Sequence, residues 1–380
     1  MRITVVASFL LLSACTTQTT TPAAPETAPA EITATDSAPP KPKSWQLSRS
    51  NRLKSKRITV AAAGDIMAGT DYPENHLPDD DGASFFAAVT PAIRSADVAF
   101  GNLEGVLLDG GEPEKTCKNP KACYLFRSPT RYAKHLKAAG FDVMSLANNH
   151  ALDFGEAGRD SSMKALRKAG IRHSGREGDY ASWTQGGVRY AMIAFSPTRF
   201  SWDLIDYQQH LPLVAELDKS HDIVLISFHG GAEGRDGVER LGFGMEYAYG
   251  ERRGDVVAFA HDMIDAGADL IIGHGPHIPR AIELYNDRLI AYSLGNFATY
   301  YGISVAGEKG YAPLLTAVLN GEGQFIEGQI ISHIQRRPDG PLPDATQKAW
   351  KMIRKLSQLD FPDQAVIYLD DGRFKPKVTD

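Results

Sequence analysis

The sequence lacks an excess of positive charge and has few cysteines. Its 41 lysine and arginine residues are outnumbered by 46 acidic residues, which gives a formal net charge of −5. No basic stripe stands out, so this balance gives no support for nucleic-acid binding. Cys117 and Cys123 have no further cysteines nearby, which argues against a cysteine-rich zinc site.

The N-terminal region lacks an apolar run long enough to span a membrane. Residues 3–12 are apolar, but a spanning helix needs about 20 such residues. The sequence LSAC at residues 12–15 follows directly and resembles a lipobox, the signal after which bacterial lipoproteins are cleaved and acylated. The alternative is an ordinary signal peptide with an incidental cysteine. We expect a signal peptide over 1–14 and a lipid anchor on Cys15, which would hold the protein on the extracytoplasmic side of a membrane.

The rest of the chain divides into three parts by composition. Residues 15–56 are rich in Thr, Pro and Ala, and a segment with so few large apolar side chains is expected to be a disordered tether. Residues 57–336 alternate strand-like and helix-like segments, and this length can bury one core. Residues 337–380 are expected to be an appendage packed on that domain.

The two remaining cysteines lie in a turn-rich loop. Asn119-Pro120 stands between Cys117 and Cys123. Cysteine pairs outside the cytoplasm usually oxidise, so we predict a disulfide between them.

Hydrophobic periodicity predicts a mixed α/β domain. The strand-like segments are 58–63, 97–101, 142–147, 188–195, 222–228, 269–273, 289–294, 314–319, 325–333 and 365–369. The helix-like segments are 83–95, 129–139, 155–169, 210–219, 254–266 and 345–359. The alternation in the early half indicates parallel βαβ units, whereas the consecutive strands of the later half predict antiparallel pairing.

Five of the apolar strand-like runs end in polar residues that can bind a metal ion. These residues are Asp65, Glu104, the run Asn148-Asn149-His150, His229, and the pair His274 and His277. Ligands of α/β proteins bind at the carboxyl edge of the sheet. Carboxylate, amide and imidazole groups suit hard and borderline divalent cations. The pattern therefore predicts one metal site at this edge.

Each of these residues also has a structural interpretation. Asp65 fits a turn or a helix cap, and Glu104 fits an exposed loop. The run ending at His150 is hard to explain by packing, and His150 is a candidate proton donor, although a left-handed turn is the alternative. Glycines flank His229 and His274, which lets a ligand approach the backbone, although a lone histidine is more often structural.

Six motifs in this order resemble the bacterial CapA/PgsA capsule-biosynthesis family. That family is associated with poly-γ-glutamate and is similar to the calcineurin-like metallophosphoesterases. The motifs are Gly64–Met67, Asn102–Gly105, Ser145–His150, His229–Glu233, Gly273–His277 and Tyr292–Phe297, and they span about residues 58–300.

The resemblance implies a four-layer αββα sandwich with mixed sheets and a metal site at the carboxyl ends of strands. It implies one or two ions of Mn, Zn or Fe. The implied metal ligands are Asp65, Glu104, Asn149, His229, His274 and His277. His150 is the implied catalytic residue, and the implied substrate-binding residues are Asn102, Asn148, Glu233 and Asn296.

The sequence departs from the broader phosphoesterase pattern at the first strand. Met67 stands where that pattern has a histidine, and a thioether is a poor ligand for a hard cation. We therefore expect one of two cation positions to be weak or empty. An extra residue between His274 and His277 puts the role of His274 in doubt, and His229 lacks the tryptophan that often follows it in the family.

Two functions follow from these residues. The first is a metal-dependent hydrolase of the cell envelope, which cleaves a phosphoester or a γ-glutamyl amide in capsule or poly-γ-glutamate biosynthesis. The second is a non-catalytic metal-containing protein that binds an anionic polymer or helps its export. The expected partners are the lipid bilayer, through acylated Cys15, and the polymer or components of a capsule synthase or export complex. A purely structural lipoprotein is a third interpretation.

Overall fold

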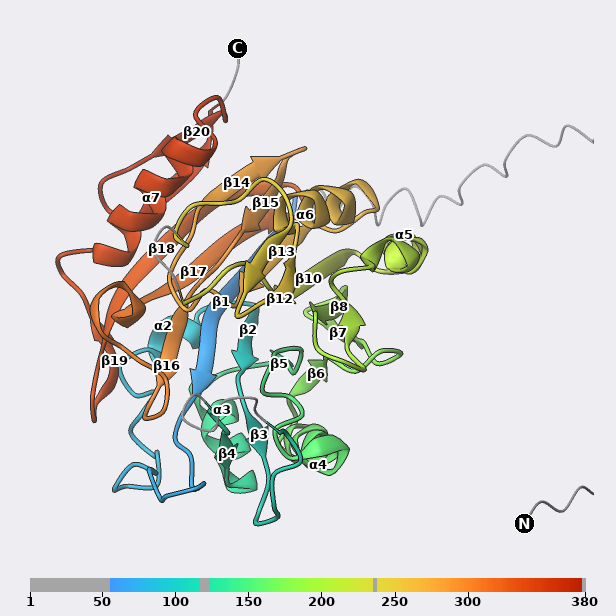
Figure 1. Ribbon diagram of the computed structural model, residues 1–380. Helices are drawn as coiled ribbons and strands as arrows, with labels where there is room; N and C mark the ends of the chain where they lie inside the picture. Colours follow the sequence, from blue (N-terminus) through green and yellow to red (C-terminus); the bar gives the residue numbers. More distant parts are fainter. Residues whose placement is uncertain (1–54, 117–122, 235–237, 378–380) are drawn as a thin grey trace, which may run out of the picture. The chain divides into compact units, whose positions relative to one another are not determined.

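Two mixed β-sheets form the centre of the computed structural model, which describes residues 55–116, 123–234 and 238–377 (Figure 1). The first sheet has ten strands in the order β20-β21-β18-β17-β1-β2-β5-β6, with β16 paired to β1 and β19 to β18. Its strands are β1 (Arg57–Met67), β2 (Val98–Leu103), β5 (Val143–Ser145), β6 (Arg172–Ser174), β16 (Asn296–Thr299), β17 (Tyr311–Asn320), β18 (Phe325–Arg336), β19 (Gly340–Pro343), β20 (Val366–Tyr368) and β21 (Arg373–Pro376).

The second sheet has seven strands in the order β14-β15-β13-β10-β8-β7, with β9 paired to β8. Its strands are β7 (Ala181–Gln185), β8 (Val188–Ser196), β9 (Trp202–Asp203), β10 (Ile223–His229), β13 (Leu270–His274), β14 (Ile282–Tyr285) and β15 (Arg288–Ala291). Two small two-stranded sheets also occur, and they are β3 (Val106–Leu107) with β4 (Arg127–Ser128), and β11 (Glu246–Ala248) with β12 (Glu251–Gly254).

Helices cover the outer face of each sheet. On the first sheet they are α2 (Thr90–Arg94), α3 (Ala133–Ala139) and α4 (Gly155–Lys168), and on the second α5 (Leu211–Ser220) and α6 (Val256–Asp265). The remaining helix is α7 (Lys348–Asp360), and the short 3₁₀ helices are Thr130–Tyr132, Tyr207–His210 and Gly307–Gly310. No helix in the described part of the chain is long and apolar enough to cross a membrane.

Three apolar clusters explain this layering. Between the sheets, Phe100 of β2 packs in one cluster with Met192 of β8 and Leu225 of β10. Leu136 of α3 belongs to a second cluster on the outside of the first sheet, and Phe259 of α6 belongs to a third on the outside of the second. The order helix, sheet, sheet, helix confirms the predicted four-layer sandwich.

Parallel strands occur where the sequence alternates strands and helices. β1, β2, β5 and β6 pair in parallel, and the arrows of β1 and β2 point the same way in Figure 1. β17 pairs antiparallel with both β1 and β18, which confirms the antiparallel pairing predicted for the later half. The carboxyl ends of the parallel strands consequently meet at one edge of the sheet.

One predicted helix is much shorter than expected. Only Thr90–Arg94 of the segment 83–95 is helical. The side chain of Asp80 accepts hydrogen bonds from the backbone N–H groups of Gly82 and Ser84, which holds the preceding segment in turns. Pro91 then lies in the first helical turn, where a missing N–H costs least.

The C-terminal segment extends the first sheet. β19 and β21 both pair with β18, and α7 lies beside β18 (Figure 1). Trp350 of α7 is 1% exposed, belongs to the cluster between the sheets, and donates its indole N–H to the carbonyl of Leu369 at 3.0 Å. This segment therefore contributes to the same core as β1 and β10.

Replacing Trp350 with alanine should strongly destabilise the whole protein. Truncation of a buried aromatic residue typically costs about 3–5 kcal/mol of unfolding free energy. Leu359→Ala on the same helix is the control, because Leu359 is 48% exposed and should cost much less. Urea unfolding measures both variants. Equal, small losses for the two would contradict the assignment of α7 to the core.

Candidate metal centre

Strand register places the first group of polar residues together. Asp65 on β1 is the register partner of Asn102 on β2 and of Asn296 on β16. The Asn102 side chain donates from Nδ2 to Asp65 Oδ1 at 2.8 Å. The position before Asp65 requires a glycine, Gly64, because a Cβ there would collide with the backbone oxygen of Gly295. All three polar side chains are completely buried.

The second sheet contributes two histidines in the same way. His229 at the end of β10 is the register partner of His274 at the end of β13, and both are fully buried. Asn102 Nδ2 lies 3.5 Å from His229 Nδ1, so the amide links the two sheets across the site. Burial lowers the pKa of His229 to about 3 and that of His274 to about 4. Both imidazoles are therefore neutral near pH 7, as metal ligands must be.

His277 occupies the centre of a group of carboxylates. Its Nδ1 lies 3.1 Å from Asp65 Oδ2 and 3.1 Å from Asn296 Oδ1. Its Nε2 lies 3.7 Å from Glu104 Oε1 and 3.3 Å from Glu233 Oε2. The backbone of His277 has a φ of 60°, an unfavourable conformation for a histidine that tends to occur at functional sites. Ligand atoms of Asp65, Glu104 and His277 all lie within 4.8 Å of one another.

Electrostatic effects within this group oppose one another. Burial raises the pKa of Glu104 well above its usual value, and the charges of Asp65 and Glu233 raise it further. Burial alone would also raise the pKa of Asp65, but the hydrogen bond and positive charge of His277 lower it. Burial would lower the pKa of His277, yet Glu104 and Asp65 raise it well above its usual value. The result is a concentrated negative potential at the site, which favours the binding of a cation.

Several buried polar atoms of this site have no hydrogen-bond partner among the residues that the structure describes. They are both carboxylate oxygens of Glu104, Oδ1 of Asn149, Nε2 of His229 and both ring nitrogens of His274. Each such atom costs about 1–3 kcal/mol when it stays unsatisfied. Oxygen and imidazole nitrogen atoms are also the ligands of Mn, Zn and Fe ions. The residues present therefore fit a divalent cation.

Glu233 adds a further carboxylate to the site, where the sequence predicted a substrate-binding residue. It is 7% exposed, and its Oε1 accepts a hydrogen bond from Arg253 Nη2 at 2.9 Å. Burial would raise the pKa of Glu233, but His277 and Arg253 lower it to about 2. Arg253, itself 4% exposed, was not anticipated, because it lies on a short strand twenty residues away with no motif around it.

The other predicted substrate-binding residues are fully buried and hold neighbouring groups in place. Asn148 donates from Nδ2 to Asn102 Oδ1 at 3.2 Å and to the carbonyl of Leu103 at 2.8 Å. Its own Oδ1 accepts from the backbone N–H of His150 at 3.1 Å. Asn296 donates to the carbonyls of Ser304 and Lys309. These amides therefore set the positions of Asp65, His150 and His277.

His150 forms a hydrogen-bonded pair with Asp153. His150 Nδ1 lies 2.7 Å from Asp153 Oδ2, and the Asp153 side chain is fully buried. The ring of His150 packs on Phe126, with centroids 4.3 Å apart. Burial lowers the pKa of His150, while the charge of Asp153 opposes this effect. Asp153 was missed, although its spacing of three residues after His150 is a signal that would have found it.

Lys115 completes the surroundings of this pair. Its Nζ donates to Asp153 Oδ1 at 2.8 Å and to the backbone carbonyl of Asn149 at 3.0 Å. No sequence pattern signals this contact, because Lys115 lies in a long loop far from His150 in the chain. The ammonium group of Lys115 thus links the backbone of Asn149, a predicted metal ligand, to Asp153, which pairs with the predicted proton donor His150.

Met67 belongs to an apolar cluster that borders the His150 pair through Phe126. It is 1% exposed and packs in an apolar cluster with Phe126 and Ile303. The residue that replaces the usual histidine thus supplies packing at the end of β1.

Four predictions concern residues that the structure does not describe. The signal peptide over 1–14, the lipid anchor on Cys15 and all but the last two residues of the tether over 15–56 lie outside the described residues, and so does Cys117 of the disulfide predicted with Cys123. All four stay predictions.

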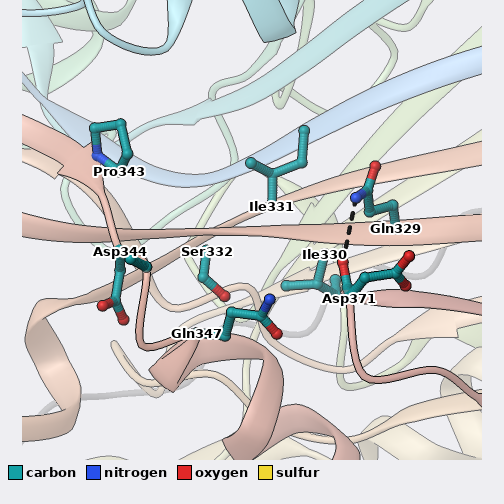
Figure 2. A pocket seen from close by; sticks show the side chains of 9 residues that line it. Gln329, Ile330, Ile331, Ser332, Pro343, Asp344, Gln347 and Asp371 are labelled. Atoms are coloured by element: carbon teal, nitrogen blue, oxygen red, sulfur yellow. Dashed lines mark hydrogen bonds between the residues drawn. The ribbon is translucent and has the colours of Figure 1, made fainter.

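A separate pocket of about 290 Å³ lies between β18 and the start of α7 (Figure 2). Its lining residues include Gln329, Ser332 and Asp344, and none of the predicted site residues. Ser332 Oγ accepts from the backbone N–H of Trp350, and Asp344 accepts from that of Lys348, so both side chains cap the helix. None of the unpartnered buried atoms in the described part of the chain belongs to this pocket.

Comparison with known proteins identifies relatives in capsule synthesis. The chain is 27% identical over 319 residues to the capsule biosynthesis protein CapA of Bacillus anthracis. This alignment covers 80% of this chain and 74% of that protein. It is 29% identical to the PGA biosynthesis protein CapA of Bacillus subtilis, which covers 79% and 78% of the two chains. A solved structure of a 5'-nucleotidase precursor from Thermus thermophilus is similar at a TM-score of 0.40 and 12% identity, and covers 82% of this chain and 60% of that chain.

The family model described as bacterial capsule synthesis protein PGA_cap matches residues 59–301, which include every residue of the metal centre. The match covers well over half of the chain, and the six ordered motifs lie within it. The chain therefore belongs to the bacterial capsule synthesis protein family.

Proposed function

We propose that this protein is a metal-dependent hydrolase of the cell envelope, which cleaves a phosphoester or a γ-glutamyl amide bond in capsule or poly-γ-glutamate biosynthesis. The proposal is carried by one observation, the buried His150–Asp153 pair beside a set of unpartnered metal-binding atoms. A site that only anchors a metal has no need of a histidine held for proton transfer. The names of the Bacillus relatives support the role in capsule or polymer biosynthesis.

The residues that would hold a divalent cation are Asp65, Glu104, His229 and His277, together with Asn149 and His274. The chemistry that such a cation supplies is Lewis acidity toward a phosphoryl or carbonyl oxygen. Mn, Zn and Fe suit this mixture of carboxylate and imidazole groups. The buried amides of Asn102 and Asn296 fix the carboxylate and the imidazole that they contact.

His150 would protonate the leaving group. Its Nδ1 is engaged by Asp153, so Nε2 is the ring nitrogen that remains for the substrate. The negative charge of Asp153 stabilises the protonated imidazole and fixes the orientation of the ring. Lys115 holds the other oxygen of Asp153, which keeps that carboxylate in place while His150 loses its proton.

Met67 favours one alternative, a non-catalytic protein that holds an anionic polymer or assists its export. The thioether packs among apolar side chains, so the first strand supplies one ligand where the broader pattern supplies two. A single cation with the remaining ligands suffices to bind an anionic group.

Metal binding should stabilise the fold. A cation that binds only the native state adds about 2.7 kcal/mol at a concentration of 100 times its dissociation constant. We expect Mn²⁺ to raise the melting temperature of the wild type and to have little effect on His229→Ala. Differential scanning calorimetry with and without Mn²⁺ measures this.

His210→Ala is the matched control for this experiment. His210 is also a buried histidine, but it packs between Phe195 and Trp202 on the other side of the second sheet. This variant should melt at a lower temperature and keep the full Mn²⁺ response. The same response in His229→Ala and the wild type would contradict the ligand assignment.

Loss of the proton donor should reduce turnover and leave metal binding intact. General acid catalysis typically contributes about 10²–10⁴ in rate, so His150→Ala should lose roughly this factor, mostly in kcat. The assay uses Mn²⁺-loaded protein on an aryl phosphodiester and on poly-γ-glutamate. Full activity of His150→Ala would make this residue structural, and an inactive wild type on both substrates would favour the polymer-binding alternative.

The membrane association of the protein is expected to depend on Cys15. We propose acylation of this residue after removal of residues 1–14, which would place the domain at the membrane surface. Mass spectrometry of the N-terminal peptide from isolated membranes should detect the lipid. An unmodified Cys15 in the mature chain, or a mature chain that starts elsewhere, would rule out this anchor.

A further inference from the structure

A hairpin with an exposed aromatic tip stands beside the metal centre. β11 and β12 pair antiparallel, and Ala248 is the register partner of Glu251, so Tyr249 and Gly250 form a two-residue turn. Tyr249 is 78% exposed, the highest value among the large hydrophobic residues found exposed in the described part of the chain. Most of this large side chain therefore lies in solvent.

The conformation of this turn makes tyrosine an unfavourable choice. Tyr249 has a φ of 51° and Gly250 a φ of 80°, and positive values at both central positions are typical of type I′ hairpin turns. Such turns favour Asn-Gly, because the left-handed region is disfavoured for bulky residues and tolerated by asparagine. The fold alone therefore favours asparagine at position 249, and the presence of tyrosine calls for another reason.

Two buried ion pairs fix this hairpin to the metal centre. Arg280 donates to both carboxylate oxygens of Glu246 on β11, at 3.1 and 2.9 Å. Arg253 on β12 pairs with Glu233, whose other oxygen lies 3.3 Å from His277 Nε2. An isolated two-stranded hairpin is only marginally stable, so these pairs hold its tip in a defined position.

The hydroxyl of Tyr249 lies next to the residues of the site. A Cβ on Gly234, the neighbour of Glu233, would collide with this hydroxyl group. Partial burial of the hydroxyl end raises the pKa of Tyr249, and the charge of Glu233 raises it further. One edge of the ring lies against Gly234, next to Glu233, and the rest of the side chain is exposed.

We propose that Tyr249 forms an aromatic subsite that binds a six-membered ring, of a sugar or an aryl group, carried by the substrate next to the reacting phosphoester. This inference rests on the proposed function and narrows its substrate class. Tyrosine offers a flat face that stacks on rings and a hydroxyl that forms hydrogen bonds. A γ-glutamyl chain has no ring and would gain little from this side chain.

The test compares three non-hydrolysable ligands on the Mn²⁺-loaded full chain. Phenylphosphonate and a glucosyl phosphonate carry a ring, and methylphosphonate does not. Calorimetry gives each dissociation constant, and the ratio of the methylphosphonate value to that of each ring ligand measures ring preference. Wild type should prefer at least one ring ligand, and the preferred ligand shows whether the ring belongs to a sugar or to an aryl group.

Tyr249→Asn separates binding from folding, because asparagine suits the turn. We expect this variant to lose ring preference by about 3- to 10-fold, in line with the energy of aromatic stacking. Its methylphosphonate affinity should stay unchanged, and its melting temperature should be equal to or above that of the wild type. Tyr249→Phe should keep the ring preference.

Phe243→Ala is the matched control. Phe243 is 54% exposed with a φ of 47°, but its ring packs on Phe361, which is not a residue of the site, so ring preference should not change. Unchanged ring preference in Tyr249→Asn, equal weakening of all three ligands, or no binding of either ring ligand by the wild type would overturn the subsite. These measurements need no turnover, so they test the subsite separately from the hydrolase activity. A protein without hydrolase activity can still show the ring preference, and an active hydrolase can lack it.

Discussion

The burial of three carboxylates around one imidazole is the constraint on which the site depends. Asp65, Glu104 and Glu233 all lie within 3.7 Å of His277, and none is more than 7% exposed. Buried like charges repel strongly, because the interior screens them poorly. Arg253 pairs with Glu233 and His277 with Asp65, whereas both oxygens of Glu104 remain without a hydrogen-bond partner in the described chain. A divalent cation removes this deficit.

The two-sheet architecture is what allows such a concentration of charge. Asp65 and His277 are 212 positions apart in the chain, and their side chains meet at 3.1 Å because the ends of β1 and β13 face each other. The layers of apolar side chains below the site exclude water and hold the strands in register. The unfavourable backbone of His277 and the close approach at Gly64 are local costs that this packing sustains.

The strands, most helices and the position of the site could be predicted from the sequence. Apolar runs that end in polar residues predicted that Asp65, His229 and His274 lie together. The prediction placed them at the edge of one sheet, whereas Asp65 belongs to the first sheet and the two histidines to the second, so the packing of the two sheets brings them together. The apolar stripe of 254–266 likewise identified α6, where Phe259 and Met263 are buried. These features depend on short-range periodicity, which is visible in one sequence.

The features that the sequence did not predict depend on contacts between distant segments. Lys115 reaches Asp153 from a loop 38 positions away, and Arg253 reaches Glu233 from a strand of only four residues, β12. Neither contact leaves a periodic pattern, and the β11–β12 hairpin is too short to register as two strands. The short helix α2 shows the reverse case, in which a side chain, Asp80, stabilises turns where helical periodicity suggested a longer helix.

The central claim is that these buried groups form one cation site, and anomalous X-ray diffraction tests it most directly. Crystals grown with Mn²⁺ would be measured near the manganese absorption edge. We predict an anomalous peak bounded by Asp65, Glu104, His229 and His277, with His277 turned from the carboxylates toward the ion. A map without a peak at this position, or with manganese bound only at other sites, would contradict the account.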